Sequence, residues 1–308
     1  MTRILITGGT GFIGQHLIPK LTELGYEVFS VEQYFWSSIE SGREYLADVN
    51  DVFALTQIFR KIKPEVVIHL AAATAVAYSY DHPNEVISTN LVGSINLAEI
   101  SRIECPRLKQ FICPSSAEVY GNNGKLLKRE DDNLEPNSPY AVSKEAVERY
   151  LKYMHYAYGF PITIFRPFNT YGRIDSHWFV VEKVIYQMLT NEKLIRLGDP
   201  DPIRDFLYVD DHIYAYLAAL ENENAIGETF NLCTGHGISI ISLVNMIKDI
   251  IGWDGVVEWQ TMSKRPLDIA NLVGSNEKLR SVLKLAEPIR LEEGLKKTIV
   301  NWRNKLGV

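Results

Sequence analysis

Cysteine is scarce in this 308-residue chain, and its three copies show no paired spacing. Closely spaced cysteine pairs would indicate a zinc site, and an even set in a short secreted chain would indicate a disulfide framework. Neither pattern occurs at Cys105, Cys113 and Cys233. We therefore expect three reduced, buried thiols in a cytoplasmic protein.

Basic clusters and long apolar runs are also missing. The 32 lysines and arginines are scattered, and the formal net charge is -6. Because faces that bind nucleic acid are normally basic, no nucleic acid partner is expected. No apolar run approaches the roughly 20 residues of a membrane-spanning helix, and the N-terminus lacks a signal-peptide pattern, so no membrane partner is expected.

Histidine has no metal-ligand spacing in this chain. The seven histidines are isolated from one another and from the cysteines, so no metal site is predicted. His69 lies in the second half of a predicted strand, and we interpret it as a hydrogen-bonded core residue rather than as a ligand.

The first half of the sequence alternates short apolar strands with helical patterns. Strands are predicted at 3–7, 27–32, 65–72, 110–116 and 161–167, and helices at 15–25, 51–64, 85–102 and 138–159. Continuously apolar strands separated by helices indicate a parallel sheet that is covered on both faces. We predict an α/β fold with a doubly wound, Rossmann-like parallel sheet.

The regular alternation of strands and helices ends at about residue 170. Helices are predicted at 178–191, 210–221, 239–251 and 291–304, strands at 193–197, 226–231 and 256–259, and loops at 197–206 and 263–270. We assign 1–170 to a dinucleotide-binding domain, to which 205–235 returns. We assign 171–204 and 236–308 to a smaller mixed α/β lobe that binds substrate. Ligands of open α/β sheets bind outside the carboxyl ends of the strands.

Residues 7–14 read TGGTGFIG and place four glycines between the first strand and the first helix. They contain Gly9-x-Gly11-x-x-Gly14 and also Gly8-x-x-Gly11-x-x-Gly14. Between a strand and a helix, this spacing predicts a dinucleotide site in which the helix N-terminus binds the pyrophosphate. A tight turn without a ligand is the alternative.

Two acids follow at positions that suit an adenosine group. Glu32 ends the second predicted strand, about 20 residues beyond the glycines. A carboxylate there accepts hydrogen bonds from the ribose and repels a 2′-phosphate, which favours NAD over NADP. Asp48 is placed to reach the adenine amino group, or else it is a solvated loop acid.

Tyr140 and Lys144 lie four residues apart on a predicted helix and hence on one face. A nearby ammonium and a nicotinamide cation would lower the tyrosine pKa from its ordinary value of about 10. Tyr140 would then take the proton of a substrate hydroxyl as hydride leaves for NAD, and Ser116 would hold the carbonyl oxygen. A surface pair on an amphipathic helix is the alternative.

The order of these motifs resembles the extended short-chain dehydrogenases/reductases, and more narrowly the NAD-dependent nucleotide-sugar epimerase/dehydratase family. Besides the glycine loop and the Tyr-x-x-x-Lys pair, the resemblance rests on HLAA (69–72), SSAEVYG (115–121), RPFNTYG (166–172), RDFLYVDD (204–211) and RPLD (265–268). It covers essentially the whole chain.

The resemblance implies that bound NAD oxidises the 4-hydroxyl of a nucleotide-diphosphate sugar and later returns the hydride. It implies a catalytic set of Ser116, Tyr140 and Lys144, and a homodimer formed through 85–102 and 138–158. It implies NAD contacts at Gly8, Gly11, Phe12, Ile13, Gly14, Glu32, Asp48, Val49, Leu70, Ala71, Ala72, Asn90, Tyr140, Lys144 and Pro167. It implies substrate contacts at Ser116, Asn169, Arg204, Arg265 and Asp268.

The reaction depends on the tripeptide Ser116-Ala117-Glu118. The dehydratases resembled here carry Thr-Asp-Glu or Thr-Ser-Glu at this place, whereas the epimerases carry Ser, a small residue and no glutamate. Ala117 cannot donate a proton, but Glu118 stands where the dehydratase base would be. We expect a 4-epimerase. The alternatives are a 4,6-dehydratase with Glu118 as its catalytic base, a 4-keto-sugar reductase and a non-catalytic NAD-binding regulator.

Overall fold

A seven-stranded parallel sheet forms the centre of the protein. We describe a computed structural model over residues 1–34, 43–174, 176–190, 193–220, 222–261 and 267–308. The strand order is β10-β6-β5-β4-β1-β2-β3. The strands are β1 (Arg3–Thr7), β2 (Glu27–Glu32), β3 (Glu44–Leu46), β4 (Val66–His69), β5 (Gln110–Pro114), β6 (Ile162–Pro167) and β10 (Thr229–Leu232). The predicted doubly wound fold is confirmed, although the short edge strand β3 was not predicted.

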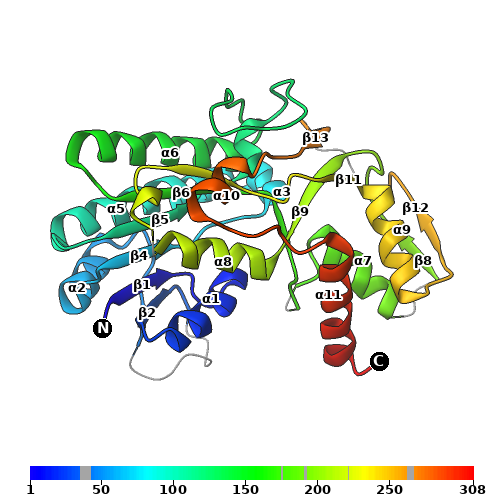
Figure 1. Cartoon of the computed structure of the whole chain (residues 1–308), viewed down its shortest axis with the longest axis horizontal. Helices are drawn as coiled ribbons and strands as arrows, with labels where there is room; N and C mark the ends of the chain where they lie inside the picture. The colour runs from blue at the N-terminus through cyan, green and yellow to red at the C-terminus, as the bar shows by residue number, and fades with distance from the viewer. Residues whose placement is uncertain (35–42, 175, 191–192, 221, 262–266) are drawn as a thin grey trace.

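Helices cover both faces of this sheet (Figure 1). Helices α1 (Phe12–Glu23) and α8 (Val209–Leu220) pack on one face, and α2 (Val52–Ile62), α5 (Gly93–Glu104) and α6 (Pro139–Tyr158) pack on the other. Along β1, Ile4 and Ile6 join one apolar core, and Leu5 joins the other. Successive side chains of a strand point to opposite faces, so a fully apolar strand fills both cores.

The helix predicted over 85–102 is interrupted by a π-helical turn. The short helices α3 (Val76–Asp81) and α4 (Pro83–Ile87) precede the π-turn η1 (Ser88–Val92), which runs directly into α5. Such turns insert an extra residue into a helix and are frequent at functional sites. Here the turn contains the buried Asn90.

The second half builds a mixed lobe at the other end of the molecule (Figure 1). Strand β9 (Ile203–Tyr208) pairs with β7 (Asn169–Tyr171), β11 (Gly237–Ser239) and β13 (Asn271–Leu272). The loop predicted over 197–206 is therefore wrong from residue 203 onward. Strand β9 begins with charged residues, which do not form the apolar run that predicts a strand. Its partners all lie at least 30 residues away along the chain, so the local sequence does not indicate the pairing.

The other predicted elements of this half form close to their expected bounds. They are α7 (Val180–Leu189), β8 (Leu194–Arg196), α9 (Ile240–Ile251), β12 (Val256–Glu258) and α11 (Leu291–Leu306). Short elements that were not predicted include the 3₁₀ turns η2 (Ala117–Tyr120) and η3 (Glu223–Ala225), the helix α10 (Glu277–Leu283), and α3, β7, β11 and β13. Strand β10 returns to the parallel sheet beside β6.

A buried ion pair fixes α6 to the sheet. Ser138 caps the N-terminus of α6 and Gly159 ends the helix in a left-handed conformation. Between them, Glu148 accepts two hydrogen bonds from Arg166 of β6, at 2.9 and 2.7 Å. Both side chains are buried. Burial alone would raise the pKa of Glu148, but the hydrogen bonds from Arg166 hold it below its usual value.

Replacing Glu148 by Gln should destabilise the protein strongly, because it leaves the Arg166 charge buried without a counter-ion. We expect a loss of about 3–5 kcal/mol in the free energy of unfolding, measured by urea denaturation. The matched control is Glu145→Gln, since Glu145 pairs with the exposed Arg149 on the same helix. That change should remove less than about 0.5 kcal/mol. Equal losses in the two variants would contradict a structural role for the buried pair.

Candidate active site

The glycine loop is packed tightly against the sheet and is open at one position. A Cβ on Gly14 would lie 2.3 Å from the carbonyl oxygen of Gly9, so only glycine lets α1 start this close to the loop. At Gly11 the nearest atom to a Cβ is the Gly8 oxygen at 3.2 Å, and Gly11 is exposed. The loop therefore leaves backbone accessible at the N-terminus of α1, where free N–H groups suit a pyrophosphate.

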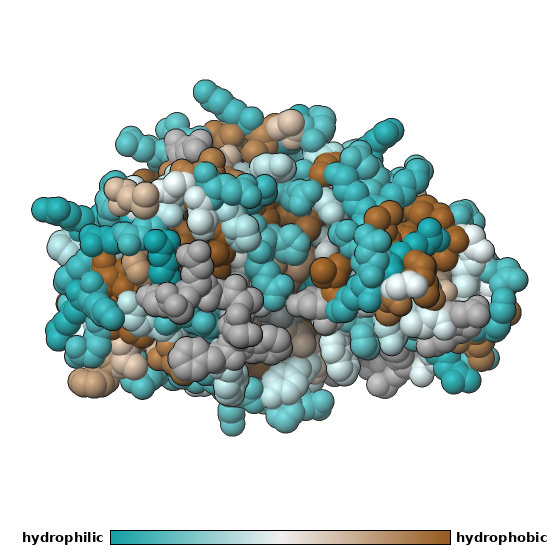
Figure 2. Space-filling model, turned by 90° about the horizontal axis from the view of Figure 1, so that it is seen from below, coloured by the Kyte–Doolittle hydropathy of each residue, from teal (hydrophilic) through white to brown (hydrophobic). Residues whose placement is uncertain are grey.

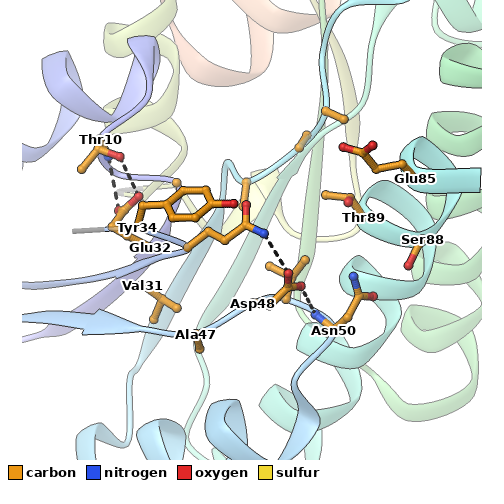
Figure 3. A pocket seen from close by; sticks show the side chains of 16 residues that line it. Thr10, Val31, Glu32, Tyr34, Ala47, Asp48, Asn50, Glu85, Ser88 and Thr89 are labelled. Atoms are coloured by element: carbon orange, nitrogen blue, oxygen red, sulfur yellow. Dashed lines mark hydrogen bonds between the residues drawn. The ribbon is translucent and has the colours of Figure 1, made fainter. Parts of the chain in front are cut away.

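A cavity of about 590 Å³ opens beside this loop (Figure 3). It is bounded by the glycine loop, the end of β2, the segment after β3, the segment after β4 and the start of η1. Predicted cofactor residues in its lining are Gly8, Glu32, Asp48, Val49, Ala71 and Ala72. The size and the carboxylates of Glu32 and Asp48 fit the adenosine part of a dinucleotide.

Other residues in the lining were not predicted. They include Thr10, Gln33, Tyr34, Asn50, Ala73, Glu85, Ser88 and Thr89. Thr10 occupies a variable position of the glycine motif, and the last three begin a helix that was predicted from its apolar spacing alone. Gln33 donates to Asp48 at 3.0 Å and the Asn50 N–H donates to it at 2.8 Å, which orients the Asp48 carboxylate.

The remaining predicted cofactor residues stand outside this lining. Gly11, Phe12, Ile13 and Gly14 belong to the loop and the start of α1, and Leu70 follows β4. Pro167 ends β6, and Tyr140 and Lys144 are buried on α6. The Arg173 guanidinium lies 4.1 Å from the centre of the Phe12 ring and 3.8 Å from that of Phe179. This cation–π contact joins the loop to the segment before α7, and it was not predicted.

Asn90 connects the cavity wall to the helix that carries Tyr140. Its side-chain oxygen accepts from the Ala73 N–H at 2.8 Å, and its amide nitrogen donates to the Ala73 oxygen at 3.0 Å. The same nitrogen donates to Ser143 at 3.1 Å, and Ser143 in turn donates to the Tyr140 carbonyl at 2.7 Å. The structure thus gives Asn90 a positioning role.

His69 continues this network toward the glycine loop. The Ser94 hydroxyl donates to the Asn90 carbonyl, so it accepts from His69 Nε2, which lies 2.9 Å away. His69 Nδ1 then accepts from the Thr7 hydroxyl at 2.7 Å, and this hydroxyl accepts from the Ala71 N–H. Burial lowers the pKa of His69 to about 3, so the ring is neutral. The prediction of a hydrogen-bonded core histidine is confirmed.

Ser116, Glu118 and Tyr140 meet at the end of β5. Ser116 caps the turn η2, with its hydroxyl accepting from the Glu118 N–H at 3.2 Å. Burial raises the pKa of Tyr140 to about 12, a hydrogen bond with Ser116 opposes this shift, and the charge of Glu118 adds to it. The arrangement brings a hydroxyl pair and a carboxylate to one point of the sheet edge.

Lys144 lies one turn of α6 beyond Tyr140, and its ammonium donates to the Pro114 carbonyl at 3.0 Å. Burial lowers the pKa of Lys144. The pKa of Tyr140 is raised in this structure, because the buried phenol loses its hydration and faces Glu118. The predicted lowering was assigned jointly to Lys144 and a nicotinamide cation.

The predicted substrate residues Asn169, Arg204 and Asp268 gather around β9, whereas Ser116 lies at the end of β5. Arg204 donates to the Asp268 carboxylate at 3.4 Å, and Asn169 donates to the Asp205 carbonyl at 3.1 Å. Asn122, four residues after Glu118, donates to the Asp268 carbonyl at 3.0 Å and connects this segment to the turn η2. The predicted contact at Arg265 lies outside the described residues.

Three features concern disulfides, metal sites and membrane-spanning helices. Cys105, Cys113 and Cys233 are buried and unpaired, as predicted. Across the described ranges, no three His, Cys, Asp or Glu side chains are grouped so that they could hold a metal ion. The surface seen in Figure 2 mixes hydrophilic and hydrophobic residues, and no helix of the described part is long and apolar enough to cross a membrane.

Comparisons with known proteins agree with this geometry. Residues 5–298 match the family model described as GDP-mannose 4,6 dehydratase. The UDP-glucose 4-epimerase of Mycolicibacterium smegmatis is 31% identical over 319 residues, which cover 98% of this chain and 99% of that protein. Human dTDP-D-glucose 4,6-dehydratase is 29% identical and is covered to 92%, with 98% of this chain aligned.

Solved structures give the same result. The UDP-glucose 4-epimerase of Thermotoga maritima with UDP-glucose superposes with a TM-score of 0.90 and 33% identity, covering 99% of this chain and all of that one. The Thermus thermophilus UDP-glucose 4-epimerase in complex with NAD gives 0.89 and 27%, with 98% and 99% covered. The fold is that of an extended short-chain dehydrogenase/reductase. The chain belongs to its nucleotide-sugar epimerase/dehydratase family, and the cofactor is NAD.

The free energy of unfolding should fall as the pH is lowered from 7 to 5. Burial holds the pKa values of His69 and His212 at about 3, against 6.5 for a free side chain. Below pH 6.5 the unfolded state therefore takes up protons that the folded state does not, and each histidine removes about 2 kcal/mol by pH 5. The loss continues until the pH reaches the folded-state values.

His212→Gln tests this expectation in urea titrations at pH 7 and pH 5. The variant should show a fall that is smaller than that of the unmodified protein by about 2 kcal/mol. The control is the exposed His236, whose replacement by Gln should leave the fall unchanged. An unaltered fall in His212→Gln would show that His212 is not neutral and buried in solution.

Proposed function

We propose that this protein is an NAD-dependent nucleotide-sugar 4-epimerase that acts through a transient 4-keto intermediate. The observation that carries the proposal is Ala117, buried between Ser116 and Glu118. A 4,6-dehydratase needs an acid to help the 6-hydroxyl leave as water, and a methyl side chain cannot supply a proton. The relatives and structures named UDP-glucose 4-epimerase support the same activity.

The proposed chemistry assigns one task to each group at the end of β5. When bound, NAD supplies the acceptor for the hydride from C4 and returns it later. Tyr140 accepts the proton of the 4-hydroxyl as that hydride leaves, and Ser116, hydrogen-bonded to Tyr140, holds the new carbonyl oxygen. Lys144, one turn away, favours the phenolate in the loaded site. After the keto sugar turns over, the same groups return the proton to the alkoxide.

The substrate diphosphate is proposed to bind at Arg204, Arg265 and Asn169, with Asp268 accepting from a ribose hydroxyl. Arginine suits this task because its guanidinium is permanently charged and forms bidentate contacts with phosphate. The Arg204–Asp268 contact of 3.4 Å is longer than an ordinary charge-assisted hydrogen bond, which suits a guanidinium that is exchanged onto a ligand. In this proposal 171–204 and 236–308 form the substrate lobe, and the three unpaired thiols fit a cytoplasmic location.

A 4,6-dehydratase is the second candidate, and Glu118 is the observation that favours it. Its charge adds to the rise that burial causes in the Tyr140 pKa, and Glu118 occupies the position of the base in the dehydratases that this chain resembles. The matching family model and the human relative are also named for dehydration. In the epimerase proposal, Glu118 binds a substrate hydroxyl and moves no proton.

Glu118→Gln separates the two candidates. The purified protein is incubated with a panel of nucleotide sugars, and the products are identified by mass and by sugar stereochemistry. An epimerase should give a new stereoisomer of unchanged mass, and Glu118→Gln should keep its rate within about tenfold. Loss of a general base instead lowers the rate by about 10²–10⁴. Tyr140→Phe should abolish turnover in either case, and Glu145→Gln is the matched control.

Loss of one water molecule from the product, together with inactivity of Glu118→Gln, would overturn the epimerase proposal in favour of the dehydratase. Turnover of 4-keto sugars only, and only with added reduced cofactor, would favour a reductase. Full activity of Tyr140→Phe would contradict every catalytic assignment made here.

We also propose a homodimer formed through α5 and α6. Exposed apolar side chains lie on both helices, including Ile103 at 62% and Val142 at 45% exposure. Val142→Glu should therefore convert a dimer into a monomer in light scattering after size exclusion. The control is Val300→Glu on α11, where Val300 is 53% exposed, and it should stay dimeric. A protein that is monomeric before substitution would contradict the proposal.

A further inference from the structure

The Glu32 carboxylate accepts three hydrogen bonds, and Figure 3 shows the two that come from Thr10. The Thr10 hydroxyl donates to Oε2 at 2.8 Å, and the Thr10 N–H donates to Oε1 at 3.3 Å. The Ser30 hydroxyl also donates to Oε1. Glu32 is only 4% exposed, and Ser30 is fully enclosed. Two of the donors come from the glycine loop and one comes from β2.

Gly9 makes room for this arrangement. A Cβ at this position would lie 2.5 Å from the Ser30 hydroxyl and 3.0 Å from Oε1 of Glu32. Any larger residue would therefore push the hydroxyl or the carboxylate away. The absence of a side chain at Gly9 serves the placement of Glu32, whereas the absence at Gly11 leaves backbone open to a ligand.

The pattern of donors determines what Glu32 can still accept. Among the described residues, Oε1 receives two hydrogen bonds, which match its two lone pairs, whereas Oε2 receives one, from Thr10. The free capacity of the carboxylate therefore lies on Oε2. Thr10 and Glu32 both line the 590 Å³ cavity that fits adenosine.

We propose that Thr10 and Ser30 are positioning residues that immobilise the Glu32 carboxylate and thereby set the preference for NAD over NADP. A carboxylate that cannot turn offers Oε2 to one ribose hydroxyl and keeps its charge where a 2′-phosphate would have to sit. A carboxylate freed from these donors turns away, so the repulsion of the phosphate falls along with the ribose contact. This inference rests on the proposed ribose position at Glu32 and is independent of which sugar reaction follows.

A purely structural role for the same hydrogen bonds would fasten the glycine loop to β2 and leave nucleotide choice unaffected. The two roles differ in a measurable ratio. Each protein is exchanged to equilibrium with an equimolar mixture of NAD and NADP and desalted. The bound nucleotides are then released and quantified by mass spectrometry. The variants are Thr10→Val, Ser30→Ala and Glu32→Gln, and melting temperatures without added nucleotide report stability.

The control is Thr22→Val on α1, where the lost hydroxyl bonds only the Ile18 carbonyl. A hydrogen bond to a charged group is worth enough that Thr10→Val and Ser30→Ala should each lower the bound NAD to NADP ratio about tenfold. Glu32→Gln should lower it at least as much, and Thr22→Val should leave it unchanged. Thr10→Val keeps the shape of threonine, so it also serves if Ser30→Ala fails to fold.

Two outcomes would overturn the inference. If Glu32→Gln lowers the ratio while Thr10→Val and Ser30→Ala stay within about twofold of the unmodified protein, the donors have only a structural role. If Glu32→Gln leaves the ratio unchanged, the ribose does not bind at Glu32. In that case the inference fails, and the proposed sugar chemistry at Tyr140 is untouched.

Discussion

Polar groups at the carboxyl ends of buried parallel strands must find their hydrogen-bond partners within the protein, and the architecture of this site follows from that constraint. The chain Ala71–Thr7–His69–Ser94–Asn90 satisfies them with one consistent direction of donation. A neutral His69 can hold only one proton arrangement in such a chain. The result is an edge whose backbone is fixed before any ligand binds, which favours ligands that need precise placement.

The same constraint places the reacting groups. Asn90 extends the network to Ser143 and so to the backbone of Tyr140. The hydrogen bonds between Arg166 and Glu148 fix α6 to β6. The Lys144 ammonium rests on the last carbonyl of β5. Helix α6 therefore cannot slide along the sheet without breaking buried polar contacts, and Tyr140 remains beside Ser116. A fixed geometry of this kind is what proton transfer at a defined oxygen requires.

The parts of the fold that local pattern determines were predictable from the sequence. Apolar runs fill both cores of the sheet, so β1, β2, β4, β5 and β6 could be placed from these runs alone. Strand β9 could not, because its partners are distant in sequence and its first residues are charged. The π-turn at Asn90 could not be predicted either, because one extra residue in a helix leaves the spacing of the apolar residues almost unchanged.

In the site, the sequence predicted residue types but not the contacts between them. Thr10 occupies a variable position of a glycine motif, and only the folded chain shows that its hydroxyl donates to the Glu32 carboxylate. The contribution of burial to the Tyr140 pKa was not predicted, because burial is a tertiary property. The preference for an epimerase over a dehydratase still rests on one alanine, and the central claim is the reversible oxidation at C4 beside Tyr140.

Isotope transfer tests that claim most directly. The protein is incubated in ordinary water with a nucleotide sugar that carries deuterium at C4, and the product is examined by mass spectrometry and NMR. Direct hydride transfer to bound NAD and back predicts that the epimerised product retains deuterium at C4. Exchange of this deuterium for solvent hydrogen would contradict the account, because it would mean that C4 loses a proton rather than a hydride.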